Sequence, residues 1–379
     1  MQPIFEEAQR LLARKEPFVL ASVVRTQGST PQKPGAKLLV RKDGTAVGTL
    51  GGGCIEADVW AEAKSILDER GSTQVRVFEL NEDIAARDGL VCGGTMEILI
   101  DPVGSVEGAG SRVEGGLPDI LADVLAAYRG EGDCALATLA EGSRAGGTGS
   151  KLFVRADGSV LGTLGSTALD TQAKAAAKEI MPRGRNRWLE TPEGKVFVEG
   201  FTTPPTLVIA GGGHVGKALY TLAKFVGFRV FIVDDRPLFA NSERFPDADG
   251  IIVDDFDAGL RSLAMGLNHY VIVATRGHKL DDLALLEAAR SKAGYVGLLG
   301  SKRKAMLIYR DLFAQGIPEE RIAQIHSPVG LNLGGRSPEE IAFSIVAEML
   351  AIKNGGDGST MKMAAPMVAK AKELSTKRR

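Results

Sequence analysis

The chain has 379 residues, which is long enough for two or more domains with substantial cores. Its 46 lysines and arginines nearly balance its 47 aspartates and glutamates, so the net charge of −1 gives no electrostatic reason to expect nucleic acid as a partner. No apolar stretch approaches the roughly 18 residues that a bilayer-crossing helix needs. Cys54, Cys92 and Cys134 are too sparse for a secreted disulfide framework, and the N-terminal residues lack the features of a signal peptide. We therefore expect a cytoplasmic protein without a membrane span.

The first elements are a helix over residues 4–15, ended by Pro17, and a β-rich strand over residues 18–24. A polar loop over residues 25–35 follows, with two prolines and several hydrogen-bonding side chains. The composition of this loop is compatible with a surface turn or with part of a binding site. A hairpin with Asp43-Gly44 as its tight turn would bring this loop close to the next glycine-rich turn.

Residues 48–56 read GTLGGGCIE, so three consecutive glycines, Gly51, Gly52 and Gly53, precede Cys54. Glycines let backbone amides approach a ligand and tolerate positive φ. The residues after Cys54 have helix-forming composition with Glu56 in the first turn. A thiol at a helix N-terminus has a lowered pKa, which favours the reactive thiolate. The alternative is a small buried cysteine beside an ordinary turn.

A second copy of this region favours the functional interpretation. Residues 35–51 align without gaps on residues 149–165, with 11 of 17 positions identical at an offset of 114. The same offset places Gly52, Gly53, Cys54 and Glu56 opposite Ser166, Thr167, Ala168 and Asp170. The second copy keeps the hairpin and lacks the cysteine, so Cys54 and its glycines are not needed for folding alone.

A second cysteine stands in a similar context, because Cys92 and Gly93 precede a strand over residues 96–100. Two such loops in one α/β unit would converge on one ligand. The prior probability that two cysteines taken at random share a binding site is low, and only the similar local sequences raise it. Residues 102–117 are glycine-rich and predict a linker between repeats at about 1–101 and 118–201. Cys134 falls in an apolar strand and is expected in the core.

The C-terminal region begins after Pro204-Pro205 and predicts a Rossmann-like doubly wound parallel sheet over residues 204–352. Gly211, Gly213 and Gly216 form a G-x-G-x-x-G fingerprint between an apolar strand and a helix, which is the context that a dinucleotide site requires. Asp234 ends the next strand, at the distance where an acid meets a ribose hydroxyl. His214 lies inside the turn, where its side chain would touch a phosphate.

His278 follows another strand and is a candidate working histidine, or else a solvated loop residue. Ser337, Pro338 and Glu340 predict a capped helix start. Residues 353–379 are mostly polar and basic and predict a mobile tail.

Six motifs in order resemble the XdhC/CoxI family of maturation factors for molybdenum hydroxylases. They are TQGSTP (26–31), GTLGGGCIE (48–56), AGGGHVG (210–216), TRGH (275–278), GSKRK (300–304) and PVGLNLG (328–334). The resemblance implies an XdhC/CoxI-type domain over residues 1–203 followed by the Rossmann-like domain.

The resemblance also implies binding of molybdenum cofactor (molybdopterin), protection of it during sulfuration by a cysteine desulfurase, and delivery to an apo xanthine dehydrogenase or carbon monoxide dehydrogenase. Cys54 would contact molybdenum through the cofactor as a thiolate, the glycines would present amides, and Glu56 would orient a pterin amine. The cofactor-binding candidates are Gln27, Gly28, Ser29, Thr30, Gly51, Gly52, Gly53, Cys54, Glu56, Cys92 and Gly93 in the first domain, and Gly211, Gly213, His214, Gly216 and Asp234 in the second. No catalytic residue is certain, and Cys54, Glu56 and His278 are the candidates.

The main alternative is an NAD(P)-dependent oxidoreductase that binds dinucleotide at Gly211 and Asp234 and uses His278 on its substrate. A third interpretation is a nucleotide-sensing scaffold, which leaves Cys54 without a role. A nucleotide would also fit as a regulatory ligand of a cofactor chaperone. A homodimer would be unsurprising, although no residue pattern requires one.

Overall fold

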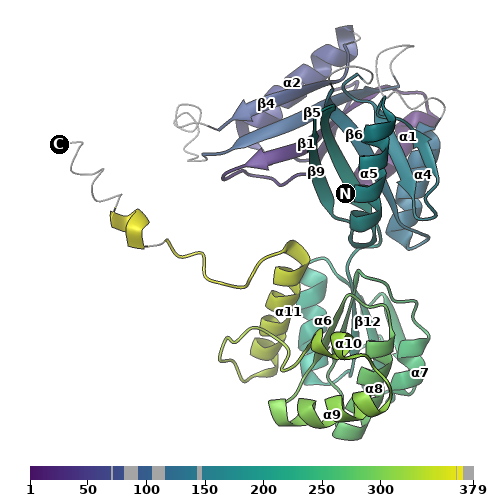
Figure 1. Ribbon diagram of the computed structural model, residues 1–379, viewed down its shortest axis with the longest axis vertical. Coiled ribbons are helices and arrows are strands. Elements are labelled where there is room, and N and C mark those ends of the chain that lie inside the picture. Colours follow the sequence, from purple (N-terminus) through teal and green to yellow (C-terminus); the bar gives the residue numbers. More distant parts are fainter. Residues whose placement is uncertain (70, 81–92, 105–115, 143–146, 364, 370–379) are drawn as a thin grey trace. The chain divides into compact units, whose positions relative to one another are not determined.

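The computed structural model describes the chain except for residues 70, 81–92, 105–115, 143–146, 364 and 370–379 (Figure 1). The chain divides into two compact units, Met1–Pro204 and Pro205–Arg379. The boundary falls within the Pro204-Pro205 pair, where the missing amide hydrogens and fixed φ angles of proline do not support regular structure.

The first unit consists of two copies of one α+β motif. Each copy has a five-stranded antiparallel sheet, ordered β3-β2-β1-β5-β4 in the first and β8-β7-β6-β10-β9 in the second. The elements of the first copy are α1 (Gln2–Ala13), β1 (Phe18–Gln27), β2 (Lys37–Arg41), β3 (Ala46–Gly48), α2 (Gly53–Glu69), β4 (Gln74–Glu79) and β5 (Thr95–Val103). Those of the second are α4 (Leu117–Arg129), β6 (Cys134–Gly142), β7 (Lys151–Arg155), β8 (Val160–Gly162), α5 (Thr167–Ile180), η1 (Met181–Arg183), β9 (Asn186–Thr191) and β10 (Gly194–Phe201).

Alternating side chains of each sheet pack into two cores. One face of the first sheet packs against α2 through residues such as Val59 and Ala63, and the second sheet packs against α5 in the same way. The opposite faces share one core with α1 and α4, in which Phe5 and Phe201 meet edge to face at 5.3 Å. The two copies therefore fold around a common interior and form a single unit.

Two buried ion pairs cross from one copy to the other. Lys37 Nζ lies 2.7 Å from Glu199 of the second copy, and Lys151 Nζ lies 2.7 Å from Asp101 of the first. The sequence offset of 114 relates Lys37 to Lys151, and the strand registers relate Asp101 to Glu199. All four residues are at most 7% exposed. The contact is therefore reciprocal, as in a symmetric dimer.

The second unit contains a six-stranded parallel sheet in the order β13-β12-β11-β14-β15-β16, which is the Rossmann order 3-2-1-4-5-6. Its elements are β11 (Thr206–Ala210), α6 (His214–Phe225), β12 (Arg229–Asp234), β13 (Gly250–Val253), α7 (Phe256–Arg261), β14 (His269–Val273), α8 (His278–Arg290), β15 (Tyr295–Leu298), α9 (Lys302–Ala314), α10 (Glu319–Ala323), β16 (Ile325–His326) and α11 (Pro338–Asn354).

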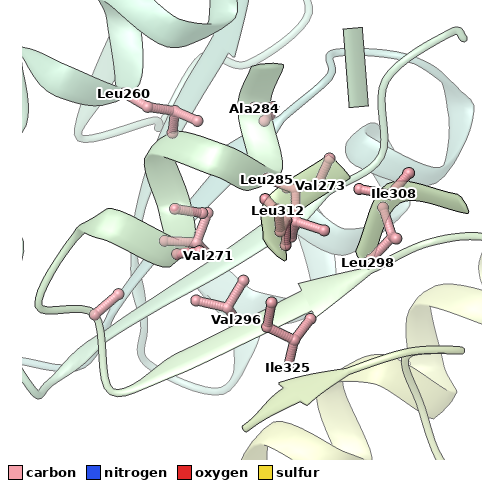
Figure 2. Close-up of a cluster of buried hydrophobic side chains, with 14 of the residues drawn as sticks. Leu260, Val271, Val273, Ala284, Leu285, Val296, Leu298, Ile308, Leu312 and Ile325 are labelled. Carbon is pink, nitrogen blue, oxygen red and sulfur yellow. The ribbon is translucent and has the colours of Figure 1, made fainter. Parts of the chain in front are cut away.

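Helices cover both faces of this sheet. Figure 2 shows one face, where Val271 and Val296 pack with Leu285 of α8 and Leu312 of α9. The other face packs against α6 and α11. Parallel strands buried on both sides are apolar throughout, which is why the first five strands of this sheet stand out in the sequence as apolar runs, whereas the two-residue β16 (Ile325–His326) was not predicted.

The expected fold class is confirmed, and the sheets of the first unit are antiparallel. Some element boundaries differ from expectation. Residues 102 and 103 of the expected linker belong to β5, α6 begins at His214, and α11 extends through Asn354 into the expected tail. The expected capping box at Ser337 is present. No helix in the described parts of the chain has the length and apolar character of a bilayer-crossing segment.

Removing one member of a reciprocal pair should destabilise the first unit. Lys37→Met leaves the Glu199 carboxylate buried without its cation, which costs about 3–5 kcal/mol of unfolding free energy. The double variant Lys37→Met/Glu199→Met removes both charges and should recover most of that loss. Urea denaturation of the two variants and the wild type measures both values. If Lys37→Met unfolds at the wild-type urea concentration, the pair does not hold the copies together.

Candidate functional site

Three loops of the first copy meet at the end of β1. A Cβ on Gly51 would lie 2.6 Å from Pro31 Cβ, so the glycine turn touches the polar loop over residues 25–35. A Cβ on Gly94 would lie 2.5 Å from the carbonyl oxygens of Gln27 and Ser29, so the strand entrance of β5 touches the same loop. The sequence-predicted residues Gln27, Gly28, Ser29, Thr30, Gly51, Gly52, Gly53 and Gly93 therefore share one region, and Cys92 lies outside the described residues.

Cys54 is the second residue of α2 and is exposed. The glycines before it have φ angles of 109°, 75° and 68°, which L-residues with side chains rarely adopt. A Cβ on Gly52 or Gly93 would meet no described atom within 4 Å, so nothing in the described part of the chain packs against either position. Among the described residues, no group of three or more His, Cys, Asp or Glu side chains is arranged to hold a metal ion.

Glu56 organises the glycine turn from within. Its Oε2 accepts hydrogen bonds from the Thr49 hydroxyl at 2.8 Å, the Leu50 amide at 2.9 Å and the Gly52 amide at 3.2 Å. Burial alone would raise the pKa of Glu56, but these hydrogen bonds lower it on balance. The amide of Gly51 donates to Thr49 Oγ1 at 3.0 Å. The amides of Gly51 and Gly52 thus serve the turn itself, whereas the sequence suggested that they face a ligand.

The second copy repeats this arrangement without a cysteine. Asp170 accepts from the Thr163 hydroxyl at 2.7 Å and the Leu164 amide at 2.8 Å, and the Gly165 amide donates to Thr163. Ser166, which aligns with Gly52, caps α5 by accepting from the Leu169 amide at 3.1 Å. The shared contacts form the scaffold, and the differences at the helix start include Gly52, Gly53 and Cys54.

The second copy also supports the candidate loop. Asn186, at the start of β9, donates from Nδ2 to the carbonyl of Pro34 at 2.9 Å. Arg25 pairs with Glu97 at 3.3 Å and with Glu190 of β9 at 2.9 Å. The polar loop is therefore held at both ends by β9 of the second sheet, through residues that the sequence did not single out.

Two glycines of the fingerprint in the second unit, Gly211 and Gly216, are required by close packing. A Cβ on Gly211 would lie 2.3 Å from the carbonyl oxygen of Ala274, and a Cβ on Gly216 would lie 2.0 Å from that of Gly211. A Cβ on Gly212 would lie 2.1 Å from the carbonyl oxygen of Phe239. Gly213 is the N-cap of α6, and the next residue, His214, is exposed.

Asp234 is fully buried, and its carboxylate is occupied by its own chain. It accepts from the Gly212 amide at 2.8 Å and from Nε and Nη2 of Arg236 at 2.9 and 3.0 Å. Burial opposes ionisation, but the hydrogen bonds from Arg236 and Gly212 lower the pKa of Asp234 on balance. This geometry assigns Asp234 to holding the glycine turn against β12, whereas the sequence suggested contact with a ribose.

Asp235, which follows Asp234, contacts a loop that follows a different strand of the sheet. Asp235 accepts two 2.7 Å hydrogen bonds from the guanidinium of Arg276, which belongs to the loop between β14 and α8. Beneath that loop, Asp281 accepts from the Thr275 hydroxyl at 2.7 Å and pairs with Lys304. His278 is the first residue of α8. The structure thus brings together the two motifs at 275–278 and 300–304.

The motif at 328–334 is held by Glu348 of α11. This carboxylate accepts from the Tyr295 hydroxyl at 2.5 Å and the Gly330 amide at 2.9 Å, and it lies 3.2 Å from His326 Nδ1. The hydrogen bond from its amide to Glu348 gives Gly330 a structural role in the fold. A separate pocket of about 390 Å³ contains none of the candidate residues and is lined by Leu11, Glu16, Pro17, Arg41, Lys42 and Asp43.

Sequence reasoning missed the contacts that join distant segments. Asp235 directly follows β12 in the sequence and Arg276 is part of a motif, but nothing local indicated their pairing. Asn186 and Glu190 carried no signal because they lie in an exposed strand of the second copy.

Two family models match the chain. The model described as the XdhC and CoxI family matches residues 11–78 and 127–191, one segment in each copy of the first unit. The model described as the XdhC Rossmann domain matches residues 207–349 of the second unit.

Similar proteins extend over most of the chain. It is 29% identical to the uncharacterized protein YqeB of Escherichia coli strain K12, over 94% of this chain and 48% of YqeB. It is 26% identical to a Bacillus subtilis strain 168 protein named as a probable xanthine dehydrogenase subunit, over 90% of this chain and 94% of that protein. It is 25% identical to the molybdenum cofactor insertion chaperone PaoD of Escherichia coli strain K12, over 88% of this chain and 83% of PaoD.

A solved structure agrees with the fold. A protein of Bacillus halodurans described as a xanthine dehydrogenase superposes with a TM-score of 0.67 at 27% identity, over 94% of this chain and 98% of that one. The chain spans about half the length of YqeB and most of the length of the other relatives. With both of its units matched by models of one family, this chain belongs to the XdhC and CoxI family.

Proposed function

We propose that this protein binds molybdenum cofactor at the three loops around Cys54 and inserts it into an apo molybdenum hydroxylase of the xanthine dehydrogenase type. The relatives named as an insertion chaperone and as a xanthine dehydrogenase subunit support this role. The cofactor is the cargo of this activity. The protein's own part is to bind it, shield it and release it.

The observation that carries the proposal is the difference between the two copies. Both copies keep the hairpin, the Thr-carboxylate contact and the helix, so folding explains these features in each. Only the first copy has Gly52 and Gly53 in place of a serine cap, and only it places an exposed thiol at the helix start. Because the glycines and the thiol occur in one copy only, they support a ligand that binds to the first copy.

The residues present fit such a cargo in chemistry. A cysteine thiolate is a soft ligand that suits molybdenum, and the space left at Gly52 and Gly93 admits a bulky group beside it. The exposed residues Gln27 and Ser29 add polar groups on the facing loop. Cys54 is the proposed metal contact, and these neighbours would hold the pterin part.

The finer steps follow from the same site. Protection during sulfuration by a cysteine desulfurase would require the loops to cover the metal, and delivery would require the client enzyme to displace them. A carbon monoxide dehydrogenase is a second client class within this proposal. The oxidoreductase alternative would need a ribose contact other than Asp234, whose carboxylate is occupied by Gly212 and Arg236.

Replacing Cys54 should abolish cofactor binding without unfolding the protein. We expect Cys54→Ala, purified from a host that makes the cofactor, to lose bound molybdenum and pterin, because the exposed thiol contributes to binding more than to packing. Metal analysis and pterin fluorescence measure the two components, and Cys92→Ala tests the second cysteine in the same way.

The second copy offers a matched control. Ala168→Cys places an exposed thiol at the corresponding helix position, without Gly52 and Gly53, and should add no second equivalent of cofactor. Wild-type protein that carries neither molybdenum nor pterin would contradict the proposed function. So would a Cys54→Ala variant that binds both as well as the wild type.

Glu56 should act on cofactor binding through the shape of the turn. Glu56→Gln weakens three hydrogen bonds, and Asp170→Asn weakens the corresponding contacts in the second copy, so each should lower the unfolding free energy by about 1–2 kcal/mol. Only Glu56→Gln should also weaken cofactor binding. Equal losses of binding in both variants would mean that general destabilisation is responsible.

The stability difference should depend on pH. Because folding lowers the pKa of Glu56 from its usual 4.5, ionised Glu56 stabilises the fold above that value, and the contribution is lost as pH falls through the lowered pKa. Wild type should therefore exceed Glu56→Gln in stability at neutral pH and approach it in acid. Thermal unfolding of both proteins across this range tests the sign.

A further inference from the structure

The outward side of α9 exposes more apolar surface than any other helix of the described chain. Its inward residues Ile308 and Leu312 belong to the core of the second unit (Figure 2). On the outward side, Met306, Leu307 and Phe313 are 73%, 40% and 50% exposed. In the described part of the chain, no other helix whose bounds are given above exposes more than one large apolar side chain. Single exposed apolar side chains are ordinary, whereas three on one helix indicate a contact surface.

The motif at 300–304 divides into residues that serve the fold and residues that do not. Ser301 caps α9 by accepting a hydrogen bond from the Lys304 amide at 3.3 Å, and the Lys304 side chain pairs with the buried Asp281. Lys302 and Arg303 are exposed, and within the described residues neither side chain has an ion pair or a hydrogen bond. We call these two residues the α9 cations.

The α9 cations occupy the end of the helix that disfavours positive charge. The N-terminal end of a helix carries a partial positive charge, and the first turn of α9 contains no acidic residue that would compensate for it. A carboxylate supplied from outside the helix would remove this repulsion. The charge distribution therefore favours an acidic counterpart.

The opposite end of α9 has the complementary charge. The C-terminal end of a helix carries a partial negative charge, and the last turn of α9 has no basic residue. Glu319 and Glu320, which we call the α10 carboxylates, follow after four residues; both are exposed and have no ion pair among the described residues. Between the two ends, Arg310 and Asp311 pair at 3.0 Å, so the exposed middle of the helix has no net charge.

A surface with cations at one end, apolar side chains in the middle and carboxylates at the other end is complementary to itself. A twofold axis perpendicular to α9 would place two copies of the helix antiparallel and bring the α9 cations of each copy to the α10 carboxylates of the other. A helix of 13 residues is about 20 Å long, so the two charged contacts lie on either side of one apolar centre. The opposed helix dipoles add to the attraction.

We propose that the outward side of α9 is the contact surface of a homodimer, in which α9 packs antiparallel against α9 of a second copy. Met306, Leu307 and Phe313 of both copies form its centre. A second copy fits this surface better than an anionic membrane does, because a membrane would repel the α10 carboxylates. The proposal does not rest on cofactor binding at Cys54, since every residue of the surface belongs to the second unit.

Shortening two of the apolar side chains should weaken the dimer. We expect sedimentation equilibrium of the full wild-type chain to show a concentration-dependent dimer. Met306→Ser/Phe313→Ser should raise its dissociation constant by about tenfold or more and leave the melting temperature nearly unchanged, because both side chains are exposed. Phe225→Ser is the matched control, since Phe225 is 88% exposed on α6 and should leave the dimer unchanged.

Charge reversal tests the pairing of the two ends. Lys302→Glu/Arg303→Glu and Glu319→Lys/Glu320→Lys should each be monomeric, because like charges then meet at both ends of the surface. An equimolar mixture of the two variants should form a heterodimer, since every charged contact again joins opposite signs. Sedimentation of the separate and mixed variants measures both results, and recovery in the mixture shows that neither variant is merely unfolded.

Three outcomes would overturn the proposal. One is a wild-type chain that is monomeric at every concentration tested. Another is a dimer that is as stable in Met306→Ser/Phe313→Ser, or in either charge-reversed variant, as in the wild type. The third is a mixture of the charge-reversed variants that stays monomeric.

A different occupant would also be recognised. A monomeric wild-type chain that sediments with vesicles of equal parts phosphatidylglycerol and phosphatidylcholine, and loses this binding in Lys302→Glu/Arg303→Glu, would assign the surface to a membrane and overturn the dimer. None of these measurements detects molybdenum or pterin, so failure here is distinguishable from failure of the proposed function.

Discussion

The first unit depends on two lysines that are buried against carboxylates of the opposite copy. Taking a lysine and a carboxylate out of water is costly, and only close pairing compensates for it. Because Lys37 requires Glu199 and Lys151 requires Asp101, neither copy can complete its interior alone. The pairs fix the alignment of the two sheets, and that alignment places Asn186 and Glu190 against the loop beside Cys54.

The two copies of the first unit have different roles. The second copy has a serine cap and a conventional helix start, and its strands brace the loop of the first. The first copy has glycines and a thiol at the same place. In the second unit, close-packed glycines hold the turn after β11. In the first unit, the positions proposed to meet a ligand are those against which no described atom packs.

Local patterns in the sequence predicted much of this. The 17-residue match revealed the duplication, and the fingerprint between a strand and a helix predicted the Rossmann sheet. Long-range pairing was not predictable, since Lys37 and Glu199 are 162 positions apart. Asp234 and Asp235 are adjacent, and successive strand residues face opposite ways, so composition alone does not show which is buried. The role of Glu56 was equally uncertain from sequence, because a carboxylate that accepts hydrogen bonds within its own turn has the same sequence pattern as one that binds a ligand.

The reciprocal pairs have a consequence for the origin of the fold. Each copy offers one lysine and one acid at equivalent positions, so the surface that a single copy presents is complementary to itself. Two identical chains, each half the length of the first unit, would satisfy the same contacts around a true twofold axis. When both copies belong to one polypeptide, they can differ in sequence. The second copy has Ala168 in place of the thiol and still supports the loop of the first copy. The asymmetry at Cys54 is therefore a specialisation that a symmetric homodimer, with its identical chains, would not have permitted.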